Sequence, residues 1–156
     1  MRKRVFKHHS GQSMVEFAVL APIFFLLLLG TIDLGRAVYI YNTISDAARE
    51  GARAAIPFDS PLPTSAQVVN AVQSKLGGGF TLSTDPCLTT PPCNTPSTPP
   101  TPNSGYIWYS SGIGATGRQP VTVKISFLFQ PWIPVVRDAA GNGVVISAES
   151  TMVTEY

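Results

Sequence analysis

The strongest constraint on the fold of this chain is an apolar run near its N-terminus. No ionisable side chain occurs from Phe17 to Ile32, although 13% of all residues are charged. The 19 residues from Met14 to Ile32 (MVEFAVLAPIFFLLLLGTI) would span roughly 28 Å as a helix, close to a bilayer core of about 30 Å. Pro22 would break a soluble helix but is tolerated in a membrane helix. We therefore predict a transmembrane helix over residues 12–32.

The distribution of charge predicts the orientation of this helix. Four of the 11 basic residues lie in the segment 1–11, and basic residues before a span favour a cytoplasmic N-terminus. The rest of the chain has seven basic and nine acidic residues, which argues against a nucleic-acid-binding protein. We expect a single-pass protein of the cytoplasmic (inner) membrane, with an extracytoplasmic domain over residues 57–156.

Two kinds of cleavage compete at this N-terminus. Removal of the whole apolar run by a secretory signal peptidase is disfavoured, because the run is long and no small-x-small site follows it. The alternative begins with a basic leader that ends at Gly11, with Glu16 as the fifth residue beyond it. This pattern resembles the type IV prepilin signal. The resemblance implies that a membrane-embedded aspartic prepilin peptidase cuts after Gly11, and that the mature chain begins at Gln12 and keeps its helix.

Glu16 has two interpretations. Ser13 and Glu16 have the spacing of a capping box, and a carboxylate in the first turn is favoured by the helix dipole. The resemblance to pilins implies a different role, in which Glu16 pairs with the free N-terminal amine of the same or a neighbouring subunit and sets the register between subunits. The two roles can coexist.

The helix is predicted to continue beyond the membrane over residues 33–56. Small residues fill much of this stretch, and they let helix backbones approach closely. Pro57 marks its end. A helix from Ser13 to Ile56 would measure roughly 66 Å, so its outer half must pack on its own domain, on neighbouring subunits, or on both. The expected apolar stripe, at spacings of four and three, is Leu34, Val38, Tyr41, Ser45, Ala48, Ala52 and Ala55.

The first third of the chain resembles the TadE-like family of pilin-related proteins over about residues 11–55. The resemblance implies a minor pilin or pseudopilin of the Tad system, which builds Flp-type pili. The implied partners are the membrane, a prepilin peptidase, other pilin or pseudopilin subunits and the Tad assembly platform. Gln12 departs from the pattern, because the family often has a small residue there. The matching residues are Gly11, Val15 to Ala18 (VEFA), Pro22, Gly30, Gly35-Arg36 and Ala47 to Arg53 (AAREGAR).

The charged part of this helix also has two interpretations. It is either a solvated alanine-rich helix with ion pairs at i,i+3 spacing, or a docking surface for partner subunits or the assembly platform. The candidate docking residues are Arg36, Arg49, Glu50, Gly51 and Arg53.

The remaining residues predict an α+β domain with an antiparallel sheet, carried on the long helix as in a pilin. Residues 57–63 are a turn or linker, and 66–76 form a short helix capped by Thr64 or Ser65 and ended by glycines. The outer half of the long helix should cover the apolar face of the sheet, and the 66–76 helix is a second candidate cover. The expected strands are Phe80–Thr84, Tyr106–Ser110, Val121–Gln130 and Val144–Tyr156, the last two with period-two patterning.

A proline-rich loop over residues 86–103 contains Cys87 and Cys93, the two cysteines of the chain. Outside the cytoplasm a disulfide is the natural state of such a pair. Free thiols are the alternative. A zinc site is a poor fit because no histidine is near, and the spacing is not that of C-x-x-C redox motifs. We predict a structural disulfide.

Nothing in the sequence indicates an enzyme. Both histidines, His8 and His9, lie in the leader, and the outer region has no catalytic triad or H-E-x-x-H motif. We expect no catalytic residue, metal, cofactor or small-molecule substrate, and we expect Trp108 and Trp132 to pack in the core or at a sheet edge. The leading hypothesis is a minor pilin or pseudopilin. The alternative is an extracytoplasmic binding module held by an uncleaved signal anchor.

Overall fold

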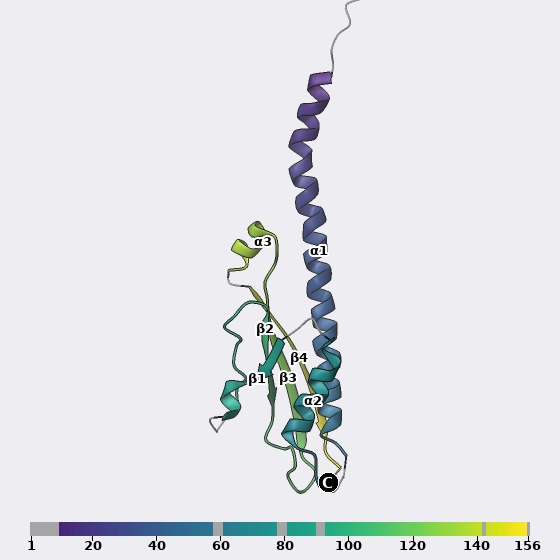
Figure 1. Cartoon of the computed structure of the whole chain (residues 1–156), viewed down its shortest axis with the longest axis vertical. Helices are drawn as coiled ribbons and strands as arrows, with labels where there is room; N and C mark the ends of the chain where they lie inside the picture. Colours follow the sequence, from purple (N-terminus) through teal and green to yellow (C-terminus); the bar gives the residue numbers. More distant parts are fainter. Residues whose placement is uncertain (1–9, 58–60, 78–80, 90–92, 142, 156) are drawn as a thin grey trace, which may run out of the picture.

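The computed structural model describes residues 10–57, 61–77, 81–89, 93–141 and 143–155. A single helix, α1 (Ser10–Ala54), is longer than the rest of the molecule and projects well beyond it (Figure 1). The other elements form a body around the C-terminal half of α1. They are α2 (Ser65–Lys75), β1 (Thr81–Thr84), the 3₁₀ turn η2 (Pro86–Thr89), β2 (Ser104–Tyr109), β3 (Pro120–Phe129), α3 (Pro134–Ala139) and β4 (Val144–Val153).

The body is α+β, as predicted, but its sheet is mixed. The four strands lie in the order β1-β2-β3-β4. β3 pairs antiparallel with both β2 and β4, whereas β1 runs parallel to β2. The expectation of a purely antiparallel sheet is therefore wrong at one edge. A parallel pair needs a long crossover, and η2 with the proline-rich loop provides it between β1 and β2.

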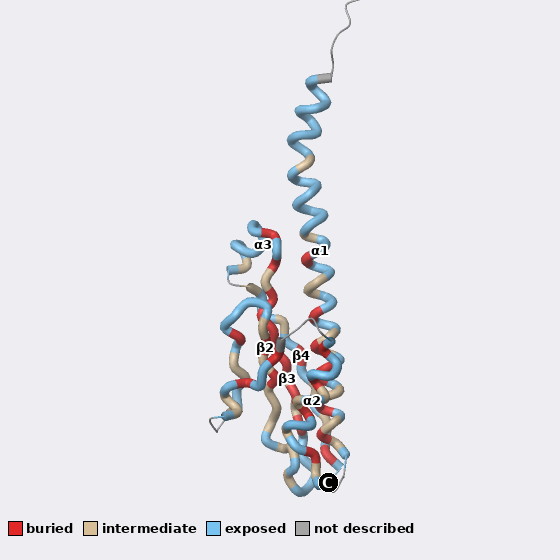
Figure 2. Tube along the Cα trace, viewed as in Figure 1, coloured by how far each residue is buried: buried red, intermediate tan, exposed pale blue. Residues whose placement is uncertain are grey.

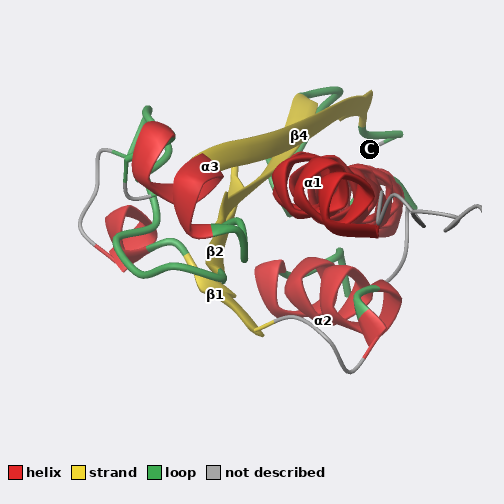
Figure 3. Ribbon diagram, turned by 90° about the horizontal axis from the view of Figure 1, so that it is seen from above, coloured by secondary structure: helices red, strands yellow, loops and turns green. Residues whose placement is uncertain are grey.

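Helices α1 and α2 lie side by side against one face of the sheet (Figure 3). Their contact with the sheet buries a single apolar core. α2 begins with a capping box between Thr64 and Gln67, in which the Thr64 backbone N–H donates to Gln67 Oε1 at 2.8 Å. The core includes Ile44, Ala47, Ala48 and Ala52 of α1, Val68 and Val72 of α2, and Ile107, Val123, Ile125 and Phe127 of the sheet.

The buried face of α1 differs from the predicted stripe. Ala48, Ala52 and Ala55 are buried as expected, but the first residues of the stripe are not: Leu34 is 65% exposed and Val38 is 52% exposed. The buried face instead starts with Asp33, Ile40 and Ile44. The prediction fails there because apolar residues surround α1 on all sides near the membrane run, so periodicity does not fix which side faces the body.

Gly51 lies where α1 packs tightly against α2 and the sheet. A Cβ at this position would lie 2.5 Å from Cγ2 of Val72 and 3.3 Å from Cγ1 of Val123. A side chain of any size would therefore push α1 away from α2 and the sheet. The small residues of this stretch are explained in part by packing within the chain itself.

Candidate functional site

The N-terminal half of α1 lies outside the body. None of the residues from 11 to 32 is buried, and the large apolar side chains among them are exposed (Figure 2). In the part of the chain that the structure describes, α1 is the one helix long and apolar enough to cross a membrane. Exposure of so many leucine and phenylalanine side chains to water would be strongly unfavourable. A single membrane-spanning anchor fits this half of the helix.

The predicted processing residues lie at the start of α1. No atom lies within 4 Å of the position that a Cβ of Gly11 would take. Gln12 Nε2 donates to Glu16 Oε1 at 3.3 Å, and both side chains are exposed. Because α1 already includes Ser10, Ser13 lies within the helix, and the capping-box interpretation of Ser13 and Glu16 does not hold for this uncut chain. Residues 1–9 of the predicted leader lie outside the described residues.

Asp33 links α1 to the body where the apolar run ends. It is the first ionisable residue after that run, yet it is only 5% exposed. Asp33 Oδ2 accepts hydrogen bonds from the backbone N–H groups of Trp132 (2.9 Å) and Ile133 (3.1 Å). These bonds to a charged acceptor fix the segment after β3 against the helix.

Arg36 completes this junction. Its Nη1 lies 3.0 Å from Asp33 Oδ1, one turn earlier on the helix. Its guanidinium carbon lies 3.8 Å from the centroid of the Trp132 ring and 5.2 Å from that of Phe129. These are cation–π distances. Arg36, a predicted docking residue, is thus engaged within its own chain, and we refer to Asp33, Arg36 and Trp132 together as the junction cluster.

The other predicted docking residues divide into two groups. Arg49 and Arg53 are exposed and Glu50 is half-buried. Arg49 Nη1 lies 3.6 Å from Asp46 Oδ1 in a solvent-exposed pair, which contributes little to stability. Gly51 is buried between α1, α2 and the sheet, so it cannot be part of an exposed docking surface.

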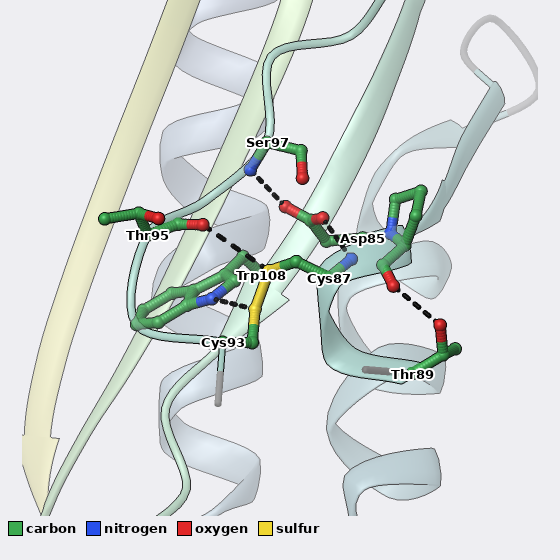
Figure 4. The surroundings of a disulfide bond; sticks show 8 residues. Asp85, Cys87, Thr89, Cys93, Thr95, Ser97 and Trp108 are labelled. Atoms are coloured by element: carbon green, nitrogen blue, oxygen red, sulfur yellow. Dashed lines mark hydrogen bonds between the residues drawn. A yellow bond between two sulfur atoms is a disulfide. The ribbon is translucent and has the colours of Figure 1, made fainter. Parts of the chain in front are cut away.

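The predicted disulfide between Cys87 and Cys93 is present. Asp85, which is fully buried, organises the loop around it (Figure 4). Its carboxylate accepts hydrogen bonds from the backbone N–H groups of Cys87 (2.9 Å) and Ser97 (2.7 Å). The Trp108 indole Nε1 donates to Cys93 Sγ at 3.2 Å. These bonds tie the described parts of the loop, residues 86–89 and 93–103, to Asp85 and to Trp108 of β2.

The role of Asp33 in the junction cluster was not predicted from the sequence. The sequence contained one signal for it, a carboxylate placed directly after a span of 16 uncharged residues, from Phe17 to Ile32. Of the two alternatives predicted for Trp132, packing in the core does not occur: Trp132 is 69% exposed and lies against Arg36 just beyond the end of β3. Among the described residues, no group of three or more His, Cys, Asp or Glu side chains could hold a metal ion.

Comparison with known proteins connects α1 to one family. A protein-family model described as TadE-like protein matches residues 11–53, almost the whole of α1. The match confirms the resemblance found in the sequence, and this family is a structural one associated with pili. No curated protein and no solved structure matches the chain.

Proposed function

Because α1 is TadE-like over residues 11–53, we propose that this chain is a minor pilin or pseudopilin of a Tad/Flp-type pilus or secretion system. In this proposal α1 holds the protein in the cytoplasmic membrane as a reservoir. After cleavage behind Gly11, the subunit enters a filament or its initiating complex at low copy number. The protein acts by assembly, and we assign it no catalytic role.

The observation that carries the proposal is the unequal covering of α1. Residues 11–32 lie outside the body, whereas the following turns are buried against α2 and the sheet. Lipid can cover the free half while the subunit waits in the membrane, and the same half of neighbouring subunits can cover it in a filament core. The body then faces outward in both states.

Glu16 and its surroundings are suited to pairing between subunits. Within the described residues, Glu16 is the one acidic residue before Asp33 on α1, and its side chain is exposed. An acidic group costs about 2.5–3.5 kcal/mol at the centre of a membrane helix and less toward its ends. Glu16 lies near the start of the predicted span, and a partner of opposite charge would still offset this cost. The amine created by cleavage before Gln12 would supply that partner.

The exposed charges Arg49 and Arg53, with Glu50 beside them, are our remaining candidates for docking to partner subunits or the assembly platform. Arg49 and Glu50 line an open surface pocket together with Lys75, at the C-terminal end of α2. Gly51 serves internal packing, and Arg36 serves the junction cluster, so neither belongs to this surface. We therefore propose a smaller docking surface than the sequence suggested.

Cleavage tests the proposal directly. We expect co-expression with the cognate prepilin peptidase to shorten the full chain by residues 1–11, as measured by intact mass. The variant Gly11→Val should remain uncut. Gly30→Val is the matched control, because Gly30 lies on the same helix with no neighbour within 4 Å of its Cβ position, and it should be cut normally. An unchanged mass of the wild-type chain would contradict the proposal and favour a binding module on an uncleaved anchor.

A further inference from the structure

We propose that residues 131–141 and 143–145, which we call the tip, are a second membrane contact, with their apolar side chains in the outer headgroup region of the bilayer that α1 spans. The ligand is the lipid surface itself. The proposal depends on membrane anchoring by α1 and not on cleavage or on a role in a pilus. The two proposals can therefore fail separately.

The tip exposes more apolar surface than a water-facing loop requires. α3 has six residues, and none of them is fully buried. The large apolar residues exposed along the tip are Trp132, Val135, Val136, Val144 and Val145. Val136 and Val144 of this set line one apolar cavity, and exposed apolar surface of this kind marks an interaction site.

The position of the tip along α1 identifies the lipid surface as its partner. Val136 of α3 and Gly30 of α1 line the same apolar cavity of about 370 Å³, together with Leu34 and Pro131. Gly30 belongs to the charge-free run, so the tip reaches back beside residues that the bilayer must cover. α3 lies at the end of the body nearest the free half of α1 (Figure 1). The tip and the free half of α1 thus form one continuous apolar surface.

The junction cluster holds the tip at this depth. The two backbone hydrogen bonds to Asp33 and the stacking of Arg36 on Trp132 lie at the base of the tip. They prevent the tip from turning toward the body, where its valines could be covered. Asp33 and Arg36 are also the first charged residues after the run, which places this cluster at the surface of the membrane.

The residue types of the tip suit an interface better than the hydrocarbon core. Tryptophan is enriched at membrane–water interfaces, where its ring meets both apolar and polar groups. Arg137 is exposed in the last turn of α3, and its long side chain can reach lipid phosphates while its stem stays in the apolar layer. Asp138 lies beside Arg137, with 3.4 Å between Nε and Oδ1, so the tip carries no unbalanced negative charge into the interface.

The two tryptophans of the chain allow a matched test. Trp108→Phe leaves Trp132 as the single tryptophan, and Trp132→Phe leaves Trp108. Trp108 pairs with Lys124 on β3. Lys124 lies five residues before Phe129, which is next to the junction cluster, so the distance along the strand is about 17 Å at 3.3 Å per residue. Trp108 should therefore remain outside the lipid while Trp132 lies within it.

The experiment uses the full chain in vesicles of phosphatidylethanolamine and phosphatidylglycerol whose acyl chains are brominated near the headgroup. We expect Trp132 emission to fall about twofold relative to unbrominated vesicles, because interfacial side chains lie about 5–10 Å into the headgroup–acyl boundary. Trp108 emission should hardly change. Adding Val135→Asp at the exposed start of α3 should weaken the quenching of Trp132.

Equal quenching of the two tryptophans, or no quenching of Trp132, would overturn the proposal. A second outcome would also overturn the proposal: a change in Trp132 emission that increases with the number of protein chains per vesicle and is the same with and without bromination. The partner of the tip would then be a second copy of the chain. If Val135→Asp disturbs the body, the comparison of Trp132 with Trp108 still decides the question without that variant.

Discussion

The two halves of α1 invert the usual relation between hydrophobicity and burial. Residues 11–32 carry phenylalanine and leucine side chains in quantity, yet none of these residues is buried (Figure 2). The half that follows is rich in alanine and glycine, and it supplies one side of the buried core. The comparison shows that the first half is not adapted to water. Its surroundings must be lipid or another apolar protein surface, and the second half is adapted to close packing inside the body.

The boundary between the two halves is built from charged groups. Asp33 and Arg36 are satisfied by each other, by backbone N–H groups and by aromatic rings. They therefore stabilise the contact between α1 and the sheet without exposing charge to the apolar surface beside it. Four substitutions test this division of the helix, and they are ordered from the largest expected effect on stability to the smallest.

The largest effect is expected in the buried half. Ile44 is completely buried among α1, α2 and the sheet, and Ile44→Ala should lower the free energy of unfolding of the body by about 3 kcal/mol, because it removes packed methyl groups and leaves a cavity. The measurement is urea unfolding of the full chain in detergent micelles, followed by tryptophan emission. Val38→Ala is the control, since Val38 is exposed on the same helix, and it should change the value by less than about 0.5 kcal/mol. Equal effects would mean that the buried face has been assigned to the wrong side.

Overpacking should give the next largest effect. Gly51→Leu places side-chain atoms where Val72 and Val123 already lie, and we expect a loss of about 2 kcal/mol in the same unfolding measurement. Gly35→Leu is the matched control, because no atom lies within 4 Å of its Cβ position. The control should leave the body as stable as the wild type. If the free energy of unfolding of the Gly51→Leu variant equals that of the wild type, α1 and α2 do not approach this closely in solution.

The sequence predicted the elements of this fold better than their contacts. The long helix follows from an uninterrupted apolar run and an alanine-rich continuation, and β3 and β4 follow from strict alternation. The parallel pairing of β1 could not be predicted, because a strand of four residues carries no signal for its partner. α3 was also missed: six residues are too few for a periodic pattern, and its start rests on Pro134 in the first turn.

The candidate site was predictable only where it is local in sequence. The pair of cysteines in one loop is a short-range pattern, and the disulfide that it predicts is present. The spacing of Gly11 and Glu16 is also short-range, and its role in cleavage stays a prediction. The bonds from Asp33 join residues 99 and 100 positions apart, and no local rule indicates that a buried carboxylate will find backbone donors at that distance. Gly51 was misassigned for the same reason, because its neighbours Val72 and Val123 come from other elements.

The junction cluster should give a smaller effect than either core substitution. Asp33→Ala removes the acceptor of the Trp132 and Ile133 backbone N–H groups, and we expect the body to lose about 1–2 kcal/mol because buried donors are left unsatisfied. Asp33→Asn retains an acceptor oxygen of the same shape and should lose less. Unfolding in detergent micelles measures both, and Trp132 emission reports the local change. Two variants of equal stability to the wild type would show that the junction does not hold the tip.

The smallest effect on stability is expected on the exposed surface of α1. A substitution there tests whether this surface binds partner subunits. Arg49→Gln breaks only a solvent-exposed pair with Asp46, so the free energy of unfolding should change by less than about 0.5 kcal/mol. If the exposed charges dock partner subunits, the same variant should nevertheless reduce the amount of Tad/Flp filament on cells, measured against Arg118→Gln, which removes an exposed charge from the loop between β2 and β3. A normal filament yield for Arg49→Gln would remove Arg49 from the docking surface. A loss of both stability and filaments would mean that Arg49 supports the body itself, and the division of α1 into a packing face and an interaction face would have to be redrawn.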